Sequence, residues 1–373
     1  MDNKETLNNL LNKSYQLVEY LNSMRYEDSI PFTDQEIEEI LAQENLESDE
    51  NYLRAIESFK ERNAFMKAPK SKRFIVYWGY PGAGKSCMAD KLIDRFGKEE
   101  DCLPFNTIDK DQHRNLFPNL FKHLKNGHID ECEKFADVTI RYVREILDLS
   151  LKLGNRSVLS IGSMGAGNDF TDNALKAIDY GYRPCAVYMS VNPDIAYLSN
   201  VYRCSSLYDK IIFQNKELYP RLVSNEYFKR VVDQLPNMID RIDRFQQEHS
   251  DNIDLMVINR SNQVLYDSRH PHELNVKEAI YSEENRELTS ADLITLNKQL
   301  TFIEKNMRYR YENNVYAPCK SEVEIAKTAV ANIINLVNTR CLDGHIIDET
   351  PHNTPDNLKD IPPFFGKDIA NDR

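Results

Sequence analysis

Residues 73–86 read RFIVYWGYPGAGKS, and this stretch decides the fold. Its first half is an apolar run that favours a buried strand, and the run breaks at once into the pattern Gly-x-x-x-x-Gly-Lys-Ser. A helix is predicted over residues 86–96, because the apolar residues there share one face. These residues are Met88, Leu92, Ile93 and Phe96. A strand, a glycine-rich loop and a helix in this order predict a Walker A phosphate loop.

The residue types of this loop suit the phosphates of a nucleotide. Glycines let the backbone curl so closely that successive N–H groups point at phosphate oxygens. Lys85 would reach the terminal phosphates, Ser86 would hold Mg²⁺, and the start of the helix would add its positive dipole end. The predicted site for nucleotide phosphates consists of Gly79, Tyr80, Pro81, Gly82, Ala83, Gly84, Lys85 and Ser86.

Length and composition narrow the class of protein. The 373 residues suggest one α/β core of about 200 residues with helical additions. No apolar run approaches the roughly 18 residues of a membrane span, and the polar start lacks a signal sequence, so we expect a cytoplasmic protein without a membrane partner. Export as an effector without a signal sequence is a remaining alternative. The net charge of −12 argues against a nucleic-acid partner, and the seven scattered cysteines are predicted to be reduced thiols.

The segments before the loop have helical patterns. Residues 5–24 carry an amphipathic stripe. Thr33 and Glu36 have the spacing of a capping box, which begins a second helix, and a third helix is predicted from about Asp49 to Phe65. A basic connector follows and leads into the first strand.

After the loop helix, predicted strands and helices alternate. Further strands are predicted at 103–111, 157–162, 183–191, 253–259 and 263–267, the last two as a hairpin. A long helix precedes the strand at 157–162, and other helices are predicted at 172–180, 193–203 and 228–245. Pro236 is expected to kink or divide the helix at 228–245, and residues 204–224 are expected to form a lid or loop.

This alternation predicts an α/β fold: a P-loop NTPase-type parallel-sheet kinase core flanked by helices, with N-terminal and C-terminal helical extensions. The chain divides into four predicted parts. They are an N-terminal helical extension at 1–30, a P-loop kinase domain at 31–268, a C-terminal helical region at 269–347 and a tail at 348–373. The tail is polar and contains four prolines, so we expect it to be disordered.

Two carboxylates follow the predicted strand at 103–111. Kinases that act on a hydroxyl need a carboxylate within reach of it to accept the proton. Asp111 is the candidate base, although its side chain could instead cap a helix. Asp109 would lie on the same strand face, where it could hold Mg²⁺ through water or fix a basic neighbour.

Several motifs, in order, resemble the zeta toxin family of bacterial toxin–antitoxin systems. The resemblance extends from residue 32 to residue 268, about two thirds of the chain. Besides the phosphate loop, its motifs are Phe32-Thr33-Asp34, Ile108-Asp109-Lys110-Asp111 with Pro118-Asn119, Gly181-Tyr182, Val231-Val232-Asp233-Gln234-Leu235-Pro236 and Leu265-Tyr266.

This resemblance implies phosphorylation, by ATP or GTP with Mg²⁺, of the 3′-hydroxyl of the amino sugar in UDP-N-acetylglucosamine. It gives Lys85 the role of binding phosphates and Asp111 the role of base. Two family arginines that grip the phosphates correspond to Arg203 and Arg221, which could otherwise be solvated surface charges. An antitoxin is the implied protein partner. The helix within residues 1–30 could lie against the cleft as an antitoxin does, or it could simply cover the core.

The acceptor side departs from the family pattern. The family's substrate-binding glutamate aligns with Arg144, so Glu145 fills that role only if the register slips by one; an ion pair between Arg141 and Glu145 is an equal account. Where the family has an acidic residue followed by Gly-Thr, this chain has a Gly-rich segment, residues 162–167, that could wrap another substrate or form a flexible turn. The candidate acceptor-site residues are Asp109, Arg114, Glu145, Gly162 and Ser163.

Two other functions fit parts of the pattern. Asp111-x-x-Arg114 behind the phosphate loop also resembles polynucleotide 5′-hydroxyl kinases, although the acidic charge argues against this reading. The chain could also bind nucleotide without turnover and serve as an interaction protein.

Overall fold

The computed structural model describes residues 3–26, 33–63, 68–109, 136–216, 218, 220–270 and 273–340. Its centre is a six-stranded sheet with the order β2-β3-β1-β4-β5-β6. The strands are β1 (Arg73–Gly79), β2 (Phe105–Asp109), β3 (Ser157–Ile161), β4 (Arg183–Met189), β5 (Asp254–Ile258) and β6 (Val264–Asp267). The first five are parallel, and β6 is antiparallel to β5 in the predicted hairpin.

The strand that carries the phosphate loop lies inside this sheet. All seven residues of β1 are buried. Tyr77 is in register with Ile161 of β3 on one side and with Val187 of β4 on the other. A continuous apolar run suits a parallel strand that is covered on both faces. The α/β class with a mostly parallel sheet is therefore confirmed.

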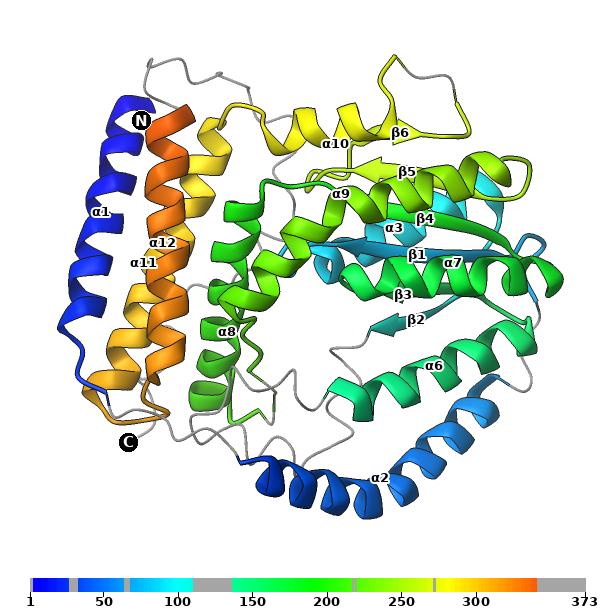
Figure 1. The fold of residues 1–373 in the computed structure, drawn as a ribbon, viewed down its shortest axis with the longest axis horizontal. Helices are drawn as coiled ribbons and strands as arrows, with labels where there is room; N and C mark the ends of the chain where they lie inside the picture. Colours follow the sequence, from blue (N-terminus) through cyan, green and yellow to red (C-terminus); the bar gives the residue numbers. More distant parts are fainter. Residues whose placement is uncertain are drawn as a thin grey trace, which may run out of the picture.

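Helices cover both faces of the sheet, as Figure 1 shows. In that view α7 (Met164–Asp179) and α9 (Asn225–Glu248) cross in front of the sheet, and α3 (Lys85–Glu100) lies behind it. The helix α6 (Ala136–Leu153) follows the β2 edge, next to α2 (Asp34–Asn63), and α10 (Val276–Glu284) adjoins the hairpin. This arrangement leaves the carboxyl ends of the parallel strands for a site.

Beside the sheet stands a layer of long helices. It consists of α1 (Asn3–Ser23), α8 (Pro193–Gln214), α11 (Ser290–Glu312) and α12 (Lys320–Arg340). α1 packs against α11 and α12, on the side of this layer that faces away from the sheet (Figure 1). The position of α1 therefore fits a helix that covers the core, and it does not fit the alternative in which this helix lies against the cleft.

A buried ion pair joins two helices of this layer. The Arg310 guanidinium on α11 donates to both carboxylate oxygens of Glu322 on α12, at 2.6 and 2.8 Å, and its Nε donates to the Tyr316 carbonyl at 2.8 Å. The guanidinium also stacks 3.6 Å from the ring centroid of Tyr208 on α8. Arg310 is completely buried, so this pair ties three helices together inside the layer.

A second ionic network ties the amino ends of the strands. Arg73 pairs with Glu100 and with Asp254, and Arg183 donates to the same Asp254. Burial favours the neutral acid, but the hydrogen bonds from Arg183 and Arg73 outweigh burial and lower the pKa of Asp254. Arg269, after β6, also pairs with Glu100. These charges lie opposite the carboxyl ends, so the network is structural.

Four helix boundaries differ from the prediction. The two helices predicted between Thr33 and Phe65 form one helix, α2, because no glycine or proline interrupts residues 42–48. Its predicted capping box is present: the Glu36 amide donates to Thr33 Oγ1 at 3.2 Å, and the Thr33 amide donates to Glu36 at 2.8 Å. α7 begins at Met164, so the helix takes up most of the predicted Gly-rich loop.

The other two differences concern α8 and α9. α8 continues to Gln214, through much of the predicted lid at 204–224, because a buried face that includes Cys204 and Tyr208 packs against α11 and α12. α9 runs without division through Pro236. Proline inside a helix costs about 3 kcal/mol, and burial of residues on both sides, such as Val231 and Ile239, offsets this cost.

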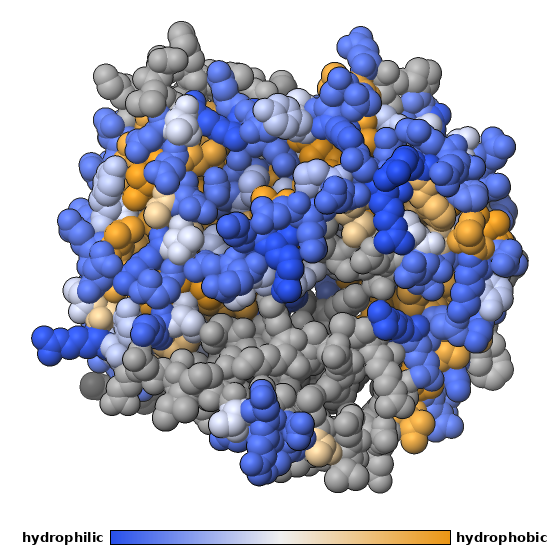
Figure 2. Space-filling view, in the orientation of Figure 1, coloured by the Kyte–Doolittle hydropathy of each residue, from blue (hydrophilic) through white to orange (hydrophobic). Residues whose placement is uncertain are grey.

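On the face shown in Figure 2, apolar side chains form separate small patches among polar ones. In the part of the chain that the structure describes, no helix has the length and apolar character needed to cross a membrane. The predicted tail at 348–373 lies outside the described residues.

Candidate functional site

The phosphate loop connects β1 to α3. Gly79, Gly82 and Gly84 have φ values of 150°, 81° and 103°, which side-chain-bearing residues rarely adopt. The Ala83 amide donates to the Tyr80 carbonyl at 3.1 Å, which closes the turn. Gly84 stands at the start of α3 and has no side chain to cap it. The backbone amides at this helix start therefore suit an anion.

Gly82 touches the backbone of α8. A Cβ atom at this position would lie 2.1 Å from the Ala196 carbonyl oxygen and 2.7 Å from the Asn200 amide nitrogen. Both contacts are with helix backbone, which cannot move aside cheaply. The loop is therefore packed against α8 at its tightest turn.

Replacing Gly82 with alanine is expected to lower the free energy of unfolding by about 2–4 kcal/mol, because the change adds a positive-φ alanine and a backbone clash. Urea unfolding measures the effect. Gly97→Ala is a matched control on α3, since the three atoms nearest to a Cβ there belong to the exposed, flexible side chain of Leu103. Equal unfolding midpoints for the Gly82 variant and the wild type would contradict the packing of the loop on α8.

Lys85 lies inside the loop. Its Nζ donates to the Gly79 carbonyl at 3.0 Å and to the Tyr80 carbonyl at 2.8 Å, and the side chain is buried. The ammonium group is therefore held at the concave side of the turn. A phosphate chain bound there would meet this positive charge.

Ser86 and Asp109 meet at the start of α3 and the end of β2. The Ser86 hydroxyl donates to Asp109 Oδ2 at 2.7 Å. A hydroxyl and a carboxylate are oxygen donors of the kind that Mg²⁺ prefers. These two residues fit the predicted metal site and would hold the ion beside the loop.

The remaining predicted catalytic residues, and the candidate acceptor-site residue Arg114, lie partly outside the described chain. Asp111 and Arg114 fall in 110–135, outside the described residues. Arg203 on α8 donates to the buried Asn200 Oδ1 at 3.1 Å. Arg203 therefore lies about one helical turn beyond Asn200, whose backbone lies against Gly82. Arg221 lies in the connection between α8 and α9, and both arginine side chains are half-buried.

Gly162 and Ser163 lie at the carboxyl end of β3. The Gly162 amide donates to the Tyr77 carbonyl of β1 at 3.1 Å, and the Ser163 hydroxyl lies 3.0 Å from the Tyr227 hydroxyl. The structure therefore brings these two residues to the edge of the sheet from which the phosphate loop starts. Helix α7 begins at Met164. The prediction that residues 164–167 form a loop around a substrate or a flexible turn is therefore wrong.

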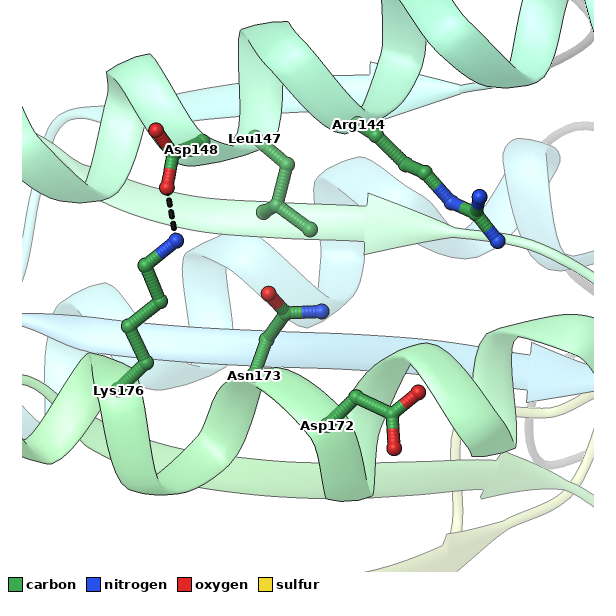
Figure 3. Close-up of a pocket in the computed structure, with 6 residues that line it drawn as sticks. All are labelled: Arg144, Leu147, Asp148, Asp172, Asn173 and Lys176. Atoms are coloured by element: carbon green, nitrogen blue, oxygen red, sulfur yellow. Dashed lines mark hydrogen bonds and ion pairs between the residues drawn. The ribbon is translucent and has the colours of Figure 1, made fainter.

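Glu145 and Arg144 are exposed on α6. Arg144 lines an open pocket between α6 and α7, together with Leu147, Asp148, Asp172, Asn173 and Lys176 (Figure 3). In that pocket Lys176 forms an ion pair with Asp148. The side chain of Arg141 lies outside the described residues, so its pairing with Glu145 stays a prediction.

Sequence reasoning missed a half-buried carboxylate next to the loop. Glu284, at the end of α10, accepts hydrogen bonds from Tyr188 of β4 at 2.9 Å and from Tyr80 of the loop at 3.5 Å. Burial raises its pKa to about 7, against the lowering effect of the two tyrosines and Arg340. No motif marks Glu284, because its role depends on contacts between distant segments.

Glu284 should make stability depend on pH. Its folded pKa of about 7 lies above the ordinary value of 4.5, so the folded protein holds the proton more tightly. The stabilisation is complete below pH 4.5 and is lost as the pH rises through about 7, by about 3 kcal/mol in total. Glu284→Gln should remove this slope, and the stability of this variant relative to the wild type should rise between pH 5 and pH 8.

Urea unfolding at four pH values across this range checks the effect. Glu287→Gln serves as the control, because Glu287 is an exposed carboxylate of the same segment. A pH slope shared by the wild type and the Glu284 variant would rule out Glu284 as its source.

Comparison with known proteins places these features in context. The family model described as "Zeta toxin" matches residues 56–271, more than half of the chain. A search of curated proteins finds no match. Among solved structures, one from a study of the PezAT chromosomal toxin-antitoxin system of Streptococcus pneumoniae is 19% identical, with a TM-score of 0.49; the match covers 75% of this chain and 98% of that one.

Two AvrRxo1-ORF1:-ORF2 crystal structures are also similar. The structure with ATP is 10% identical with a TM-score of 0.46, and the native complex is 12% identical with a TM-score of 0.44. Each match covers 82% of this chain and 96% of the other. Structural similarity with TM-scores below 0.5 supports no conclusion about activity. Membership of a family therefore rests on the match of the family model.

Proposed function

The chain belongs to the zeta toxin family of P-loop kinases, and on this premise we propose that it transfers the γ-phosphoryl group of ATP or GTP to a hydroxyl of a nucleotide-linked small molecule. UDP-N-acetylglucosamine is the first acceptor to test. The observation that supports the proposal most is the Ser86–Asp109 contact beside a loop that already holds Lys85. The end of β2, the start of α3 and Lys85 therefore lie together where a phosphate chain would bind.

The proposed roles follow from the chemistry of the transfer. The bond between the acceptor oxygen and the γ-phosphorus forms, the bond from that phosphorus to the leaving nucleoside diphosphate breaks, and Asp111 takes the hydroxyl proton. Lys85, with Arg203 and Arg221, would stabilise the negative charge spread over the transferred group. Mg²⁺, held by Ser86 and Asp109, would neutralise charge on the phosphates.

An antitoxin would be a separate chain on this proposal. The helix α1 packs on α11 and α12 and thereby occupies a structural position in the layer. Because α1 already has this role, it is a weaker candidate for an inhibitor than a second protein would be.

A labelled phosphate-transfer assay tests the proposal. Purified protein with γ-labelled ATP or GTP is offered UDP-N-acetylglucosamine, a metabolite extract and a 5′-hydroxyl oligonucleotide. We expect label on a nucleotide-linked compound, lost in Asp111→Asn and kept in Asp94→Asn, which changes an exposed aspartate of α3. Preferred labelling of the oligonucleotide would indicate a polynucleotide kinase. Nucleotide binding with no labelled acceptor would indicate an interaction protein.

A further inference from the structure

An arginine outside the phosphate-loop motif forms hydrogen bonds with the backbone of that loop. Arg260 lies in the turn between β5 and β6. Its Nε donates to the Ala83 carbonyl at 2.9 Å, and one terminal nitrogen donates to the Gly82 carbonyl at 2.7 Å. One guanidinium group thereby binds two consecutive peptide carbonyls of the loop.

These hydrogen bonds to the carbonyls also affect where the N–H groups of the same peptides point. In a trans peptide the C=O and the N–H point in opposite directions. A donor that holds the Ala83 carbonyl outward therefore turns the Gly84 amide inward, where phosphate oxygens bind in such loops. Positioning of this amide before the nucleotide arrives reduces the ordering that binding requires.

The guanidinium is itself held by α8 and α11. The terminal nitrogen of Arg260 that bonds the Gly82 carbonyl also donates to Ser199 Oγ on α8 at 3.1 Å, and Gln299 Nε2 on α11 donates to the same oxygen at 3.0 Å. The Ser199 hydroxyl in turn donates to the Ile195 carbonyl at 2.8 Å. The single donor and both acceptor positions of this hydroxyl are therefore used. A chain of hydrogen bonds joins α11 to the phosphate loop.

Among the described residues, the half-buried guanidinium of Arg260 forms no ion pair. No carboxylate described in the structure lies within 4 Å of this guanidinium; burial lowers its pKa to about 10, and the more distant charge of Asp292 opposes this shift only in part. Charges taken out of water normally require a counter-charge. The phosphates of a nucleotide in the loop would supply one, and the cation would in turn strengthen their binding.

We propose that Arg260 is a positioning residue for nucleotide phosphates, and that Ser199 and Gln299 hold it in place. The inference rests on the proposed function, because it takes a nucleotide to be the ligand of the loop. It adds Arg260 of the β5–β6 hairpin to the phosphate site. It also adds Gln299 of α11, which lies beyond the residues that the family model matches.

Isothermal titration with ATP and with tripolyphosphate tests the inference. Arg260→Gln should weaken both ligands about tenfold to a hundredfold, since a hydrogen-bonded charge is lost. Arg260→Lys keeps the charge and should recover part of the affinity. Gln299→Met should cause a smaller loss, because Gln299 acts only through Ser199. Arg244→Gln is the control, since Arg244 is an exposed arginine bonded to its own helix.

The outcomes separate the inference from the proposed function. Loss of affinity at an unchanged urea midpoint, with partial rescue by lysine, supports positioning. If the wild type binds ATP and Arg260→Gln binds it equally well, the inference is overturned; if the wild type binds neither ligand, the proposed function fails instead. Should Arg260→Gln not fold, Gln299→Met and Ser199→Ala carry the test, and wild-type affinity in both folded variants overturns the inference.

Discussion

Replacing Lys85 with alanine is expected to lower the rate of phosphoryl transfer by roughly a thousandfold. The ammonium group lies at the concave side of the loop, held 2.8 and 3.0 Å from two carbonyls, so it needs little movement to meet a phosphate. Charge that develops on the transferred group is stabilised most by donors that are already in place. The loss should therefore fall mainly on kcat.

Steady-state kinetics with the acceptor found in the labelling assay measure this effect. Lys98→Ala is the matched control, because Lys98 is an exposed lysine of the same helix. The Lys85 variant should keep the wild-type circular dichroism spectrum, since hydrogen bonds to two loop carbonyls contribute little to the helices and strands. A variant that keeps more than a tenth of the wild-type rate would show that Lys85 does not have the proposed role.

Replacing Glu322 with alanine should lower the free energy of unfolding by about 3–5 kcal/mol. The change leaves the guanidinium of Arg310 buried without its carboxylate, in the middle of the helical layer. Urea unfolding measures the effect. Glu304→Ala is the control, because its i,i+4 pair with Arg308 is partly exposed to solvent and should contribute about 0.5 kcal/mol or less.

A double variant separates the cost of an unpaired charge from the value of the pair. Arg310→Met with Glu322→Leu removes both charges and keeps apolar volume, so it should recover most of the stability lost in Glu322→Ala. If the double variant were as unstable as the single one, packing of the two long side chains, rather than an unpaired charge, would explain the loss.

The features that could be predicted from sequence depend on residues close together in the chain. The phosphate loop, the capping box of Thr33 and the β5–β6 hairpin each follow from a few neighbouring positions, and the structure contains all three. The alternation of strands and helices likewise predicted the α/β class. Local patterns could not define where α8 ends, because its extension depends on burial against α11 and α12.

The parts of the site that sequence did not predict depend on distant contacts. Arg260 had no motif to mark it, and its bonds to Gly82 and Ala83 cross the fold from the far hairpin. No local pattern marks Glu284, since its contacts with Tyr188 and Tyr80 come from distant segments of the chain. Periodicity and spacing carry no information on which far-apart segments meet.

The separation between Arg260 and the loop also has a consequence during protein synthesis. Arg260 lies 178 residues beyond Gly82 in the chain. At translation rates of about 5–20 residues per second, the loop leaves the ribosome on the order of ten to thirty seconds before the arginine that holds its carbonyls. If the loop depends on that cation, the nascent chain carries its phosphate-binding motif through this interval without the means to bind tightly. A member of a toxin family would then gain its affinity for nucleotide only late in translation.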